Sequence, residues 1–370
     1  MLNQAKNVVL IAPLGNPNRR PRLHKYIEIL NDDSGVEFWG WARSKVDRVA
    51  YQDTFSQRNI LYGGGFRNRF VYALYPIWIL MVFLNLVIFR PKKVIAMGLE
   101  TGSACYLASL FINFDYIYDD PDRFVLVFRM PKFVKRILTR FERLVSEKSE
   151  LHIIPSTLRY NYHSEKFFVL QNTPTRVQYE YALRKKRTRS KGFIVYVNGL
   201  LTNTRGLAVI TNAASKLRNI NSEISFIVAS KGHDKSAEQF FSLSNVNYLG
   251  ELSPNDALSY YPVTDVVLTF YDPCVQINRY AMPNKWGDAQ CFGTKIIVNK
   301  ECLTAKSIIE SGNAESVTYG DCDELVFKLI KLAEDSMSNS SYSDHQNKMN
   351  GDFDFFDDAS KLILDQFVSL

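Results

Sequence analysis

Short apolar runs recur along the chain and alternate with segments of helical spacing, and this alternation constrains the fold most. Each run is rich in β-branched or aromatic residues and is followed by a polar or glycine-containing segment. The clearest runs are residues 8–12, 115–118, 193–197, 224–229 and 265–270. Strands that alternate with helices pair in the same direction. The sequence therefore predicts an α/β fold with parallel sheets.

A basic run at residues 184–191 divides this pattern into two halves. It holds six basic residues without apolar periodicity, which is the composition of a linker. A chain of 370 residues is long enough for two domains. We predict two Rossmann-like domains that face across a cleft, with ligands at the carboxyl ends of the strands. The predicted parts are a first domain at 1–184, a linker at 185–192, a second domain at 193–350, and a C-terminal helix at 351–370 that packs back on the first domain.

Composition indicates a globular protein that meets anionic partners in a reducing compartment. Hydrophobic residues make up 46% of the chain and charged residues 22%, and the formal net charge is +7. Such a surface favours nucleotides, phospholipid headgroups or nucleic acid. The five cysteines and five histidines show neither a disulfide framework nor metal spacing. We therefore expect no bound metal and a cytoplasmic location.

Residues 70–89 form the most apolar segment. Their length matches that of a membrane-spanning helix, which needs about twenty apolar residues. Pro76 and Asn85 interrupt the segment, and the residues after it have the pattern of a strand of the same domain. A span would separate the two halves of that domain across a bilayer. The sequence therefore favours a buried helix and leaves open whether this helix enters the bilayer.

Residues 123–148 form a basic amphipathic stretch. Apolar residues recur there at helical spacing, and eight basic residues stand against two acidic ones. This pattern predicts a face for anionic lipid headgroups, and hence a peripheral position on the inner face of the plasma membrane. The alternative is an ordinary domain helix with a solvated basic side.

Residues 283–293 carry groups suited to a phosphate and a sugar hydroxyl. Proline stands where a helix should begin and glycine where it should end. Asn284, Lys285 and Asp288 have the spacing of one helix face. A cation at a helix N-terminus can bind an anion. Gly287 is costly within a helix, and close approach to a ligand or a neighbouring strand explains it best.

Five elements follow one another in the second half of the chain. They are Val197-Asn198-Gly199 with Arg205-Gly206, Ala229-Ser230-Lys231-Gly232, Val246 to Gly250, Thr264-Asp265-Val266, and Pro283 to Val298. In this order they resemble the C-terminal domain of GT-B glycosyltransferases, most closely the family-4-like group (glycosyl transferases group 1) of bacterial surface polysaccharide synthesis. The first half is similar more loosely, around residues 16–30 and 142–156.

The resemblance implies a nucleotide-sugar donor bound by the second domain. Its diphosphate must be held, and the charge that develops on the leaving group must be stabilised. The expected donor residues are Gly199, Arg205, Lys231, Tyr280, Asn284, Lys285 and Asp288. Asp288 stands where the family has a glutamate that binds the ribose. Tyr280 replaces a sugar-contacting glutamate and Leu200 replaces an arginine, which leaves the sugar contacts, and activity itself, open.

The first domain would bind the acceptor in such an enzyme. The expected acceptor-side residues are Gly15, Asn16, Arg19, Arg20, Glu100 and Asp119. Retaining members of the family need no protein nucleophile or base and usually no metal, so we expect retention and metal independence. If the enzyme inverts, Asp120 or Asp122 is the candidate general base. Lys285 is the third expected catalytic residue, at the leaving diphosphate.

We therefore expect a glycosyltransferase that adds a sugar to a growing, lipid-linked bacterial glycan such as O-antigen lipopolysaccharide, capsule or exopolysaccharide. Three alternatives stay open. Asp120-Pro121-Asp122 resembles the D-x-D metal motif of GT-A glycosyltransferases. Epimerases of nucleotide sugars with the GT-B fold share the donor site. A nucleic-acid-binding module fits the net charge, although its basic runs lack interleaved aromatic residues and no recognition motif is present.

Overall fold

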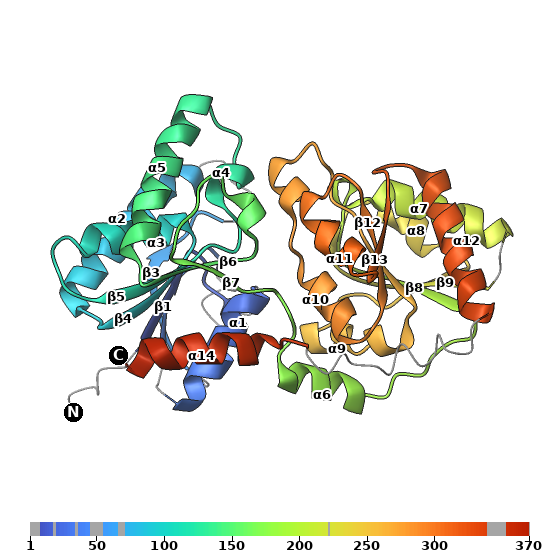
Figure 1. The fold of residues 1–370 in the computed structure, drawn as a ribbon, viewed down its shortest axis with the longest axis horizontal. Coiled ribbons are helices and arrows are strands. Elements are labelled where there is room, and N and C mark those ends of the chain that lie inside the picture. Colours follow the sequence, from blue (N-terminus) through green and yellow to red (C-terminus); the bar gives the residue numbers. More distant parts are fainter. Residues whose placement is uncertain are drawn as a thin grey trace. The chain divides into compact units, whose positions relative to one another are not determined.

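The computed structural model describes residues 8–17, 20–33, 36–44, 55–65, 71–220, 223–338 and 353–369 (Figure 1). The chain forms two compact units. Unit 1 comprises Met1–Leu170 together with Asp357–Leu370, and unit 2 comprises Gln171–Phe356. Each unit is built on one parallel sheet covered by helices.

Unit 1 contains a seven-stranded sheet in the order β3-β2-β1-β4-β5-β6-β7. The strands are β1 (Val8–Ala12), β2 (Val36–Ala42), β3 (Ser56–Tyr62), β4 (Lys93–Met97), β5 (Asp115–Asp119), β6 (Leu151–Ile154) and β7 (Phe167–Val169). The helices are α1 (Pro21–Asp33), α2 (Val71–Phe89), α3 (Leu99–Ala108), α4 (Phe124–Val127), α5 (Lys132–Lys148), η3 (Thr157–Arg159) and α14 (Phe356–Ser369). Figure 1 shows α2, α3 and α5 on one face of this sheet and α1 and α14 on the other.

Unit 2 contains a six-stranded sheet in the order β10-β9-β8-β11-β12-β13. The strands are β8 (Phe193–Leu201), β9 (Ile224–His233), β10 (Val246–Tyr248), β11 (Val266–Thr269), β12 (Lys295–Asn299) and β13 (Ala314–Val317). The longer helices are α6 (Arg176–Arg184), α7 (Leu207–Ile220), α10 (Asn284–Cys291) and α12 (Cys322–Ser338). The shorter ones are η4 (Asn203–Arg205), α8 (Ala237–Phe241), α9 (Pro254–Leu258), η5 (Tyr261–Val263), η6 (Gln276–Tyr280), η7 (Leu303–Ala305) and α11 (Lys306–Glu310).

The apolar runs of the sequence form the central strands of both sheets. All five residues of β1 are buried. In β8, Phe193, Val195 and Val197 pack into one core cluster, whereas Ile194 and Tyr196 pack into another. A parallel sheet covered by helices on both faces requires strands that are buried on both sides. The predicted α/β class with two Rossmann-like parallel sheets is confirmed.

The boundaries between the two units differ from the domain boundaries predicted from the sequence. Residues 171–184, expected in the first domain, lie in unit 2, where α6 begins with a capping box of Thr175 and Gln178. Residues 357–370 cluster with unit 1, and Lys93 Nζ lies 5.0 Å from the ring centroid of Phe367. Helix α14 therefore contributes to the packing of unit 1.

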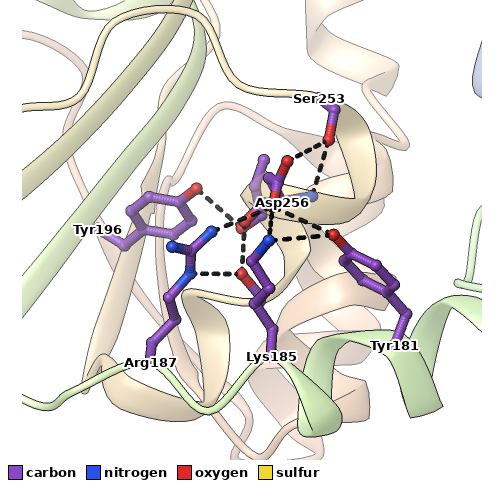
Figure 2. A network of polar contacts seen from close by, with 8 residues as sticks. Tyr181, Lys185, Arg187, Tyr196, Ser253 and Asp256 are labelled. Atoms are coloured by element: carbon purple, nitrogen blue, oxygen red, sulfur yellow. Dashed lines mark hydrogen bonds and ion pairs between the residues drawn. The ribbon is translucent and has the colours of Figure 1, made fainter.

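The basic run expected as a linker is tied to unit 2 (Figure 2). Lys185 Nζ and Arg187 Nη2 each lie 3.2 Å from Asp256 Oδ1, at the start of α9. Arg189 Nη2 lies 2.8 and 2.9 Å from the two carboxylate oxygens of buried Asp265. A hydrogen bond from Ser253, followed by Lys185, holds the pKa of Asp256 below its usual range. The run is therefore an ion-paired part of unit 2.

Helix α2 is buried along one side only. Trp78, Val82 and Leu86 are fully buried in the core of unit 1. The exposed side presents Ile77, Leu80, Leu84 and Ile88. Within the described residues, no helix combines the length and the apolar character that crossing a membrane requires.

Candidate functional site

The strand order of unit 2 defines one point where a ligand is expected. From β8 the chain passes to β9 on one side, and it later returns to β11 on the other side of β8. Ligands of open α/β sheets bind outside the carboxyl ends of the strands at such a reversal. Gly199 near the end of β8, the loop after β11 and the start of α10 lie at this edge.

Lys285 brings a cation to the end of β8. Gly199 has a φ of +89°, and a β-carbon built on it would lie 3.4 Å from Lys285 Cε and 3.6 Å from Nζ. Glycine provides both this backbone conformation and the space. Lys285 Nζ forms no hydrogen bond or ion pair with any residue that the structure describes. Burial, followed by the charge of Arg205, lowers the pKa of Lys285 to about 8, against the opposing charge of Asp288. A bound anion would complete this arrangement.

Arg205 supplies a second cation from the loop after β8. Gly206 follows it with a φ of +77°, and a β-carbon there would lie 2.5 Å from Phe270 Cβ, so this loop packs tightly on the end of β11. The Arg205 guanidinium carbon lies 4.4 Å from the ring centroid of Tyr271. Arg205 Nη1 donates a hydrogen bond to Asn278 Oδ1 at 3.3 Å. Two cations therefore lie close to each other at this edge.

Asp288 lies one helical turn after Lys285 and beside two buried phenols. Burial raises the pKa of Tyr196 and of Tyr261, and the negative charge of Asp288 adds to both shifts. Asn198 Nδ2 donates to Tyr261 OH at 3.2 Å. The carboxylate of Asp288 and the two cations thus form one charged cluster at the carboxyl edge of the sheet.

Gly287 allows another segment to approach helix α10. A β-carbon at Gly287 would lie 2.5 Å from Asn172 O and 2.9 Å from Thr173 Cα. Asn172 Nδ2 also donates to Met282 O, just before the helix, at 2.8 Å. The sequence predicts close approach to a ligand or a neighbouring strand here. The neighbour is the backbone of residues 172–173, which lie just after the start of unit 2.

The other expected donor residues have less defined contacts. Asn284 is the first residue of α10 and is half-buried. Tyr280 ends η6 and is also half-buried. Lys231 belongs to β9, but its side chain lies outside the described part of the chain. The structure therefore brings Gly199, Arg205, Lys285 and Asp288 together, and the donor roles of all seven residues stay predictions.

Unit 1 has a corresponding reversal between β1 and β4. Gly15 and Asn16, two of the expected acceptor-side residues, follow β1 at this edge. Gly98 follows β4 with a φ of +85° and precedes α3. Arg19, another expected acceptor-side residue, lies outside the described residues.

Glu100, in the first turn of α3, is the charged centre of this edge. Burial raises the pKa of Glu100, whereas its own backbone N–H and the charges of Arg20 and Arg43 oppose the rise. Arg43 Nη2 donates to Pro13 O and to Tyr75 OH, at 3.1 Å in both cases. Arg20 and Glu100, both expected on the acceptor side, are therefore brought together, with Arg43 in addition.

The carboxylates at the end of β5 are held by different partners. Asp119 is buried and accepts a hydrogen bond from Arg22 Nε at 2.8 Å. Asp120 is buried and accepts one from Tyr160 OH at 2.7 Å. Asp122 is exposed on the following turn. Among the described residues, no group of three or more His, Cys, Asp or Glu side chains could hold a metal ion.

Asp120 makes the stability of the protein depend on pH. Burial, followed by the charge of Glu142, raises the pKa of Asp120 from 3.8 to about 7. The folded chain thus holds this proton more tightly than the unfolded chain. The stabilisation is full below about pH 4 and is lost as the pH rises through about 7. We expect this group to lower the free energy of unfolding by about 2–4 kcal/mol between these pH values.

Urea unfolding at a series of pH values measures this effect. Asp120→Asn cannot ionise, so its free energy of unfolding should fall less steeply between pH 4 and pH 8 than that of the wild type. Glu142, whose pKa burial also raises, contributes a residual slope of the same sign. Equal slopes for variant and wild type would contradict the assignment to Asp120.

Solved structures share this fold over nearly their whole length. HepE from Anabaena, in complex with UDP, is 14% identical, with 98% of this chain and 100% of that chain covered and a TM-score of 0.70. Sucrose-phosphate synthase from Thermosynechococcus elongatus is 10% identical, with 98% and 99% covered and a TM-score of 0.68. The chain has the GT-B fold. A UDP-N-acetylglucosamine 2-epimerase is 9% identical, with 98% and 95% covered and a TM-score of 0.61.

The GT-B assignment rests on structure. No protein-family model matches the chain, and no curated protein is significantly similar to it in sequence. The alternative that Asp120-Pro121-Asp122 is the D-x-D motif of a GT-A glycosyltransferase requires the GT-A fold. The chain has two separate parallel sheets instead, which argues against this alternative.

Several residues at the two edges were not singled out from the sequence. They are Arg43, Tyr160, Asn172, Tyr271 and Asn278. None belongs to a motif. Tyr271 lies two residues after β11, at the carboxyl edge of the unit 2 sheet, and this position is the one local signal that could have drawn attention to it.

Proposed function

We propose that the protein is a glycosyltransferase that transfers a sugar from a nucleotide-sugar donor. One observation carries the proposal. Lys285, beside Arg205 at the strand reversal of unit 2, has an ammonium group that forms no ion pair with any described residue, and the single carboxylate of Asp288 faces both cations. A nucleoside diphosphate brings two negative charges to such a place. The GT-B fold supports the proposal, since HepE has been solved with UDP and with UDP-glucose.

The proposed mechanism places the leaving diphosphate against Lys285 and Arg205. Preorganised cations stabilise the negative charge that develops as the bond to the sugar breaks. Asp288 accepts hydrogen bonds from the ribose hydroxyls. The reaction needs no metal ion in this scheme, because the two side chains provide the positive charge. Retention of the anomeric configuration remains part of the proposal. If the reaction inverts, exposed Asp122 is better placed to reach an acceptor than buried Asp120.

A panel of nucleotide sugars, scored by release of free nucleotide, tests the donor proposal. The expected result is release from one donor class, unchanged by a chelator. Loss of activity with chelator would favour a metal-dependent mechanism. Failure of every nucleotide and nucleotide sugar to bind or to stabilise the protein would overturn the proposal.

Epimerisation of a nucleotide sugar is the second candidate, since an epimerase is among the structures with this fold. The same panel separates the two activities. An epimerase converts the donor sugar without an acceptor, and the product retains its nucleotide. A transferase releases the nucleotide and responds to an added acceptor.

We further propose that the acceptor is a lipid-linked bacterial surface glycan, reached from an anionic membrane surface. Helix α5 presents a basic stripe of Lys132, Arg136, Arg140 and Arg143, all exposed. Phe133, Ile137 and Leu144 are exposed on the same helix. Helix α3 packs against both α5 and α2, so the exposed apolar side of α2 belongs to the same layer of unit 1. Basic and apolar side chains together favour anionic lipid headgroups.

Reversing three charges on α5 should weaken membrane binding. The variant Lys132→Glu, Arg136→Glu, Arg140→Glu is expected to lose at least about tenfold in affinity for vesicles with anionic lipid, because each basic residue near such a surface contributes about 1 kcal/mol. Co-sedimentation with anionic and neutral vesicles measures the affinity. The matched control reverses three exposed lysines of unit 2, Lys216, Lys306 and Lys331. Equal binding by both variants would contradict a role for α5.

A further inference from the structure

The loop between β11 and α10 contains a buried amide that contacts the donor-site arginine. Asn278, in η6, is 5% exposed. Its Nδ2 donates to Asp272 O at 3.0 Å, and its Oδ1 accepts the hydrogen bond from Arg205 Nη1 at 3.3 Å. Both ends of the amide are thus occupied. One end fixes the turn in its own loop, and the other end reaches a different loop.

Arg205 is restrained from a second side by the same loop. Its guanidinium carbon lies 4.4 Å from the ring centroid of Tyr271. The backbones are also joined, because Asp272 N donates to Thr204 O at 3.0 Å. The absence of a β-carbon at Gly206 lets the two loops touch. The loop after β11 therefore fixes both the position of the η4 turn and the orientation of the arginine that ends it.

We propose that Asn278 is a positioning residue that holds the Arg205 guanidinium in place for the diphosphate of the donor. The proposal rests on the proposed function and adds a residue that no motif of the sequence marks. A long arginine side chain loses much rotational freedom when it binds a phosphate. A guanidinium that is already held loses less, so binding is tighter.

The charges around Lys285 provide a signature that a purely structural residue would lack. Lys285 faces Arg205 from η4 and Asp288 from its own helix. Because the charge of Arg205 lowers the pKa of Lys285, release of Arg205 into solvent should let that pKa rise. Loss of Asn278 should therefore weaken diphosphate binding and also move its alkaline limit to higher pH.

A double-mutant cycle tests the proposal. UDP, GDP, ADP, dTDP and inorganic pyrophosphate are first titrated into the wild type, and the tightest binder is used throughout. Asn278→Ala is expected to raise its Kd about 5- to 30-fold at pH 7, the range of typical coupling free energies. In an Arg205→Ala background the same substitution should have almost no effect. Gln276→Ala, an exposed amide on the same short helix, is the matched control.

Additive effects of the two substitutions, or an unshifted pH profile of Asn278→Ala, would overturn the positioning role. If Asn278→Ala does not fold by circular dichroism, Asn278→Ser is carried through the same cycle and judged in the same way. Failure of the wild type to bind any of the five probes would overturn the proposed function instead, which keeps the two failures distinguishable.

Discussion

Replacing Lys285 with alanine is expected to lower donor turnover by at least about a hundredfold, the cost of removing one preorganised donor to a developing negative charge. The free energy of unfolding should not decrease. Lys285 Nζ has no ion-pair partner among the described residues of the ligand-free protein, and burial lowers its pKa. Burial disfavours this charge and it forms no ion pair, so its removal should cost the folded state little beyond the lost attraction to Asp288. Steady-state kinetics and urea unfolding, measured side by side, should show lost activity at equal or higher stability.

Lys306→Ala is the matched control for Lys285→Ala. Lys306 is 79% exposed and lies 3.7 Å from Glu310 in an exposed ion pair, which contributes little to stability. Its removal should leave both turnover and stability unchanged. Unchanged turnover in Lys285→Ala would exclude this residue from the site.

The pH profile gives an independent measurement of the same group. Because the pKa of Lys285 is about 8 in the ligand-free protein, binding of a nucleoside diphosphate should weaken as the pH rises through this value. Lys285→Arg stays charged and should bind with a flatter profile, although its longer side chain changes the geometry.

The fold could be predicted from the sequence because the patterns that indicate it lie within short, continuous segments. The apolar runs at 8–12 and 193–197 are too short for helices, and each is followed by a turn and a helical pattern. Burial on both faces leaves a parallel sheet as the structure that satisfies such runs. The clustering of Gly199, Arg205, Lys285 and Asp288 could also be predicted, because these residues lie close to strand ends or helix starts.

Contacts between segments that are distant in the sequence could not be predicted. The basic run at 184–191 has the composition of a linker, yet its partners Asp256 and Asp265 lie about seventy residues away. Asp120-Pro121-Asp122 has the composition of an exposed turn, but the packing of η3 buries Asp120 under Tyr160. Asn278 is an unremarkable amide until the loop carrying Arg205 folds against it.

Gly287→Ala is expected to destabilise unit 2 and to weaken donor binding together. At an exposed position inside a helix, alanine stabilises the folded state by about 1 kcal/mol relative to glycine. Here the new methyl group would lie 2.5 Å from Asn172 O and 2.9 Å from Thr173 Cα, both backbone atoms. Overpacking of this kind costs about 1–3 kcal/mol, and because a contact of 2.5 Å cannot persist, either α10 or residues 172–173 must move. We expect a net loss of about 2 kcal/mol in the free energy of unfolding.

A movement of α10 in Gly287→Ala should also affect binding of the nucleoside diphosphate. Lys285 and Asp288 flank Gly287 on α10, and the hydrogen bond from Asn172 Nδ2 to Met282 O holds the residue just before the helix. A shift of this helix by a few tenths of an ångström changes the distance between Lys285 and the diphosphate, so binding of the nucleoside diphosphate should weaken about tenfold or more. Gly232→Ala is the matched control, since among the described residues its β-carbon would meet only the flexible side chain of Leu200, at 3.4 Å. If Gly287→Ala is as stable as Gly232→Ala and binds the nucleotide as tightly, then the contact with residues 172–173 does not fix the position of α10. Loss of stability with intact binding would limit this contact to the fold.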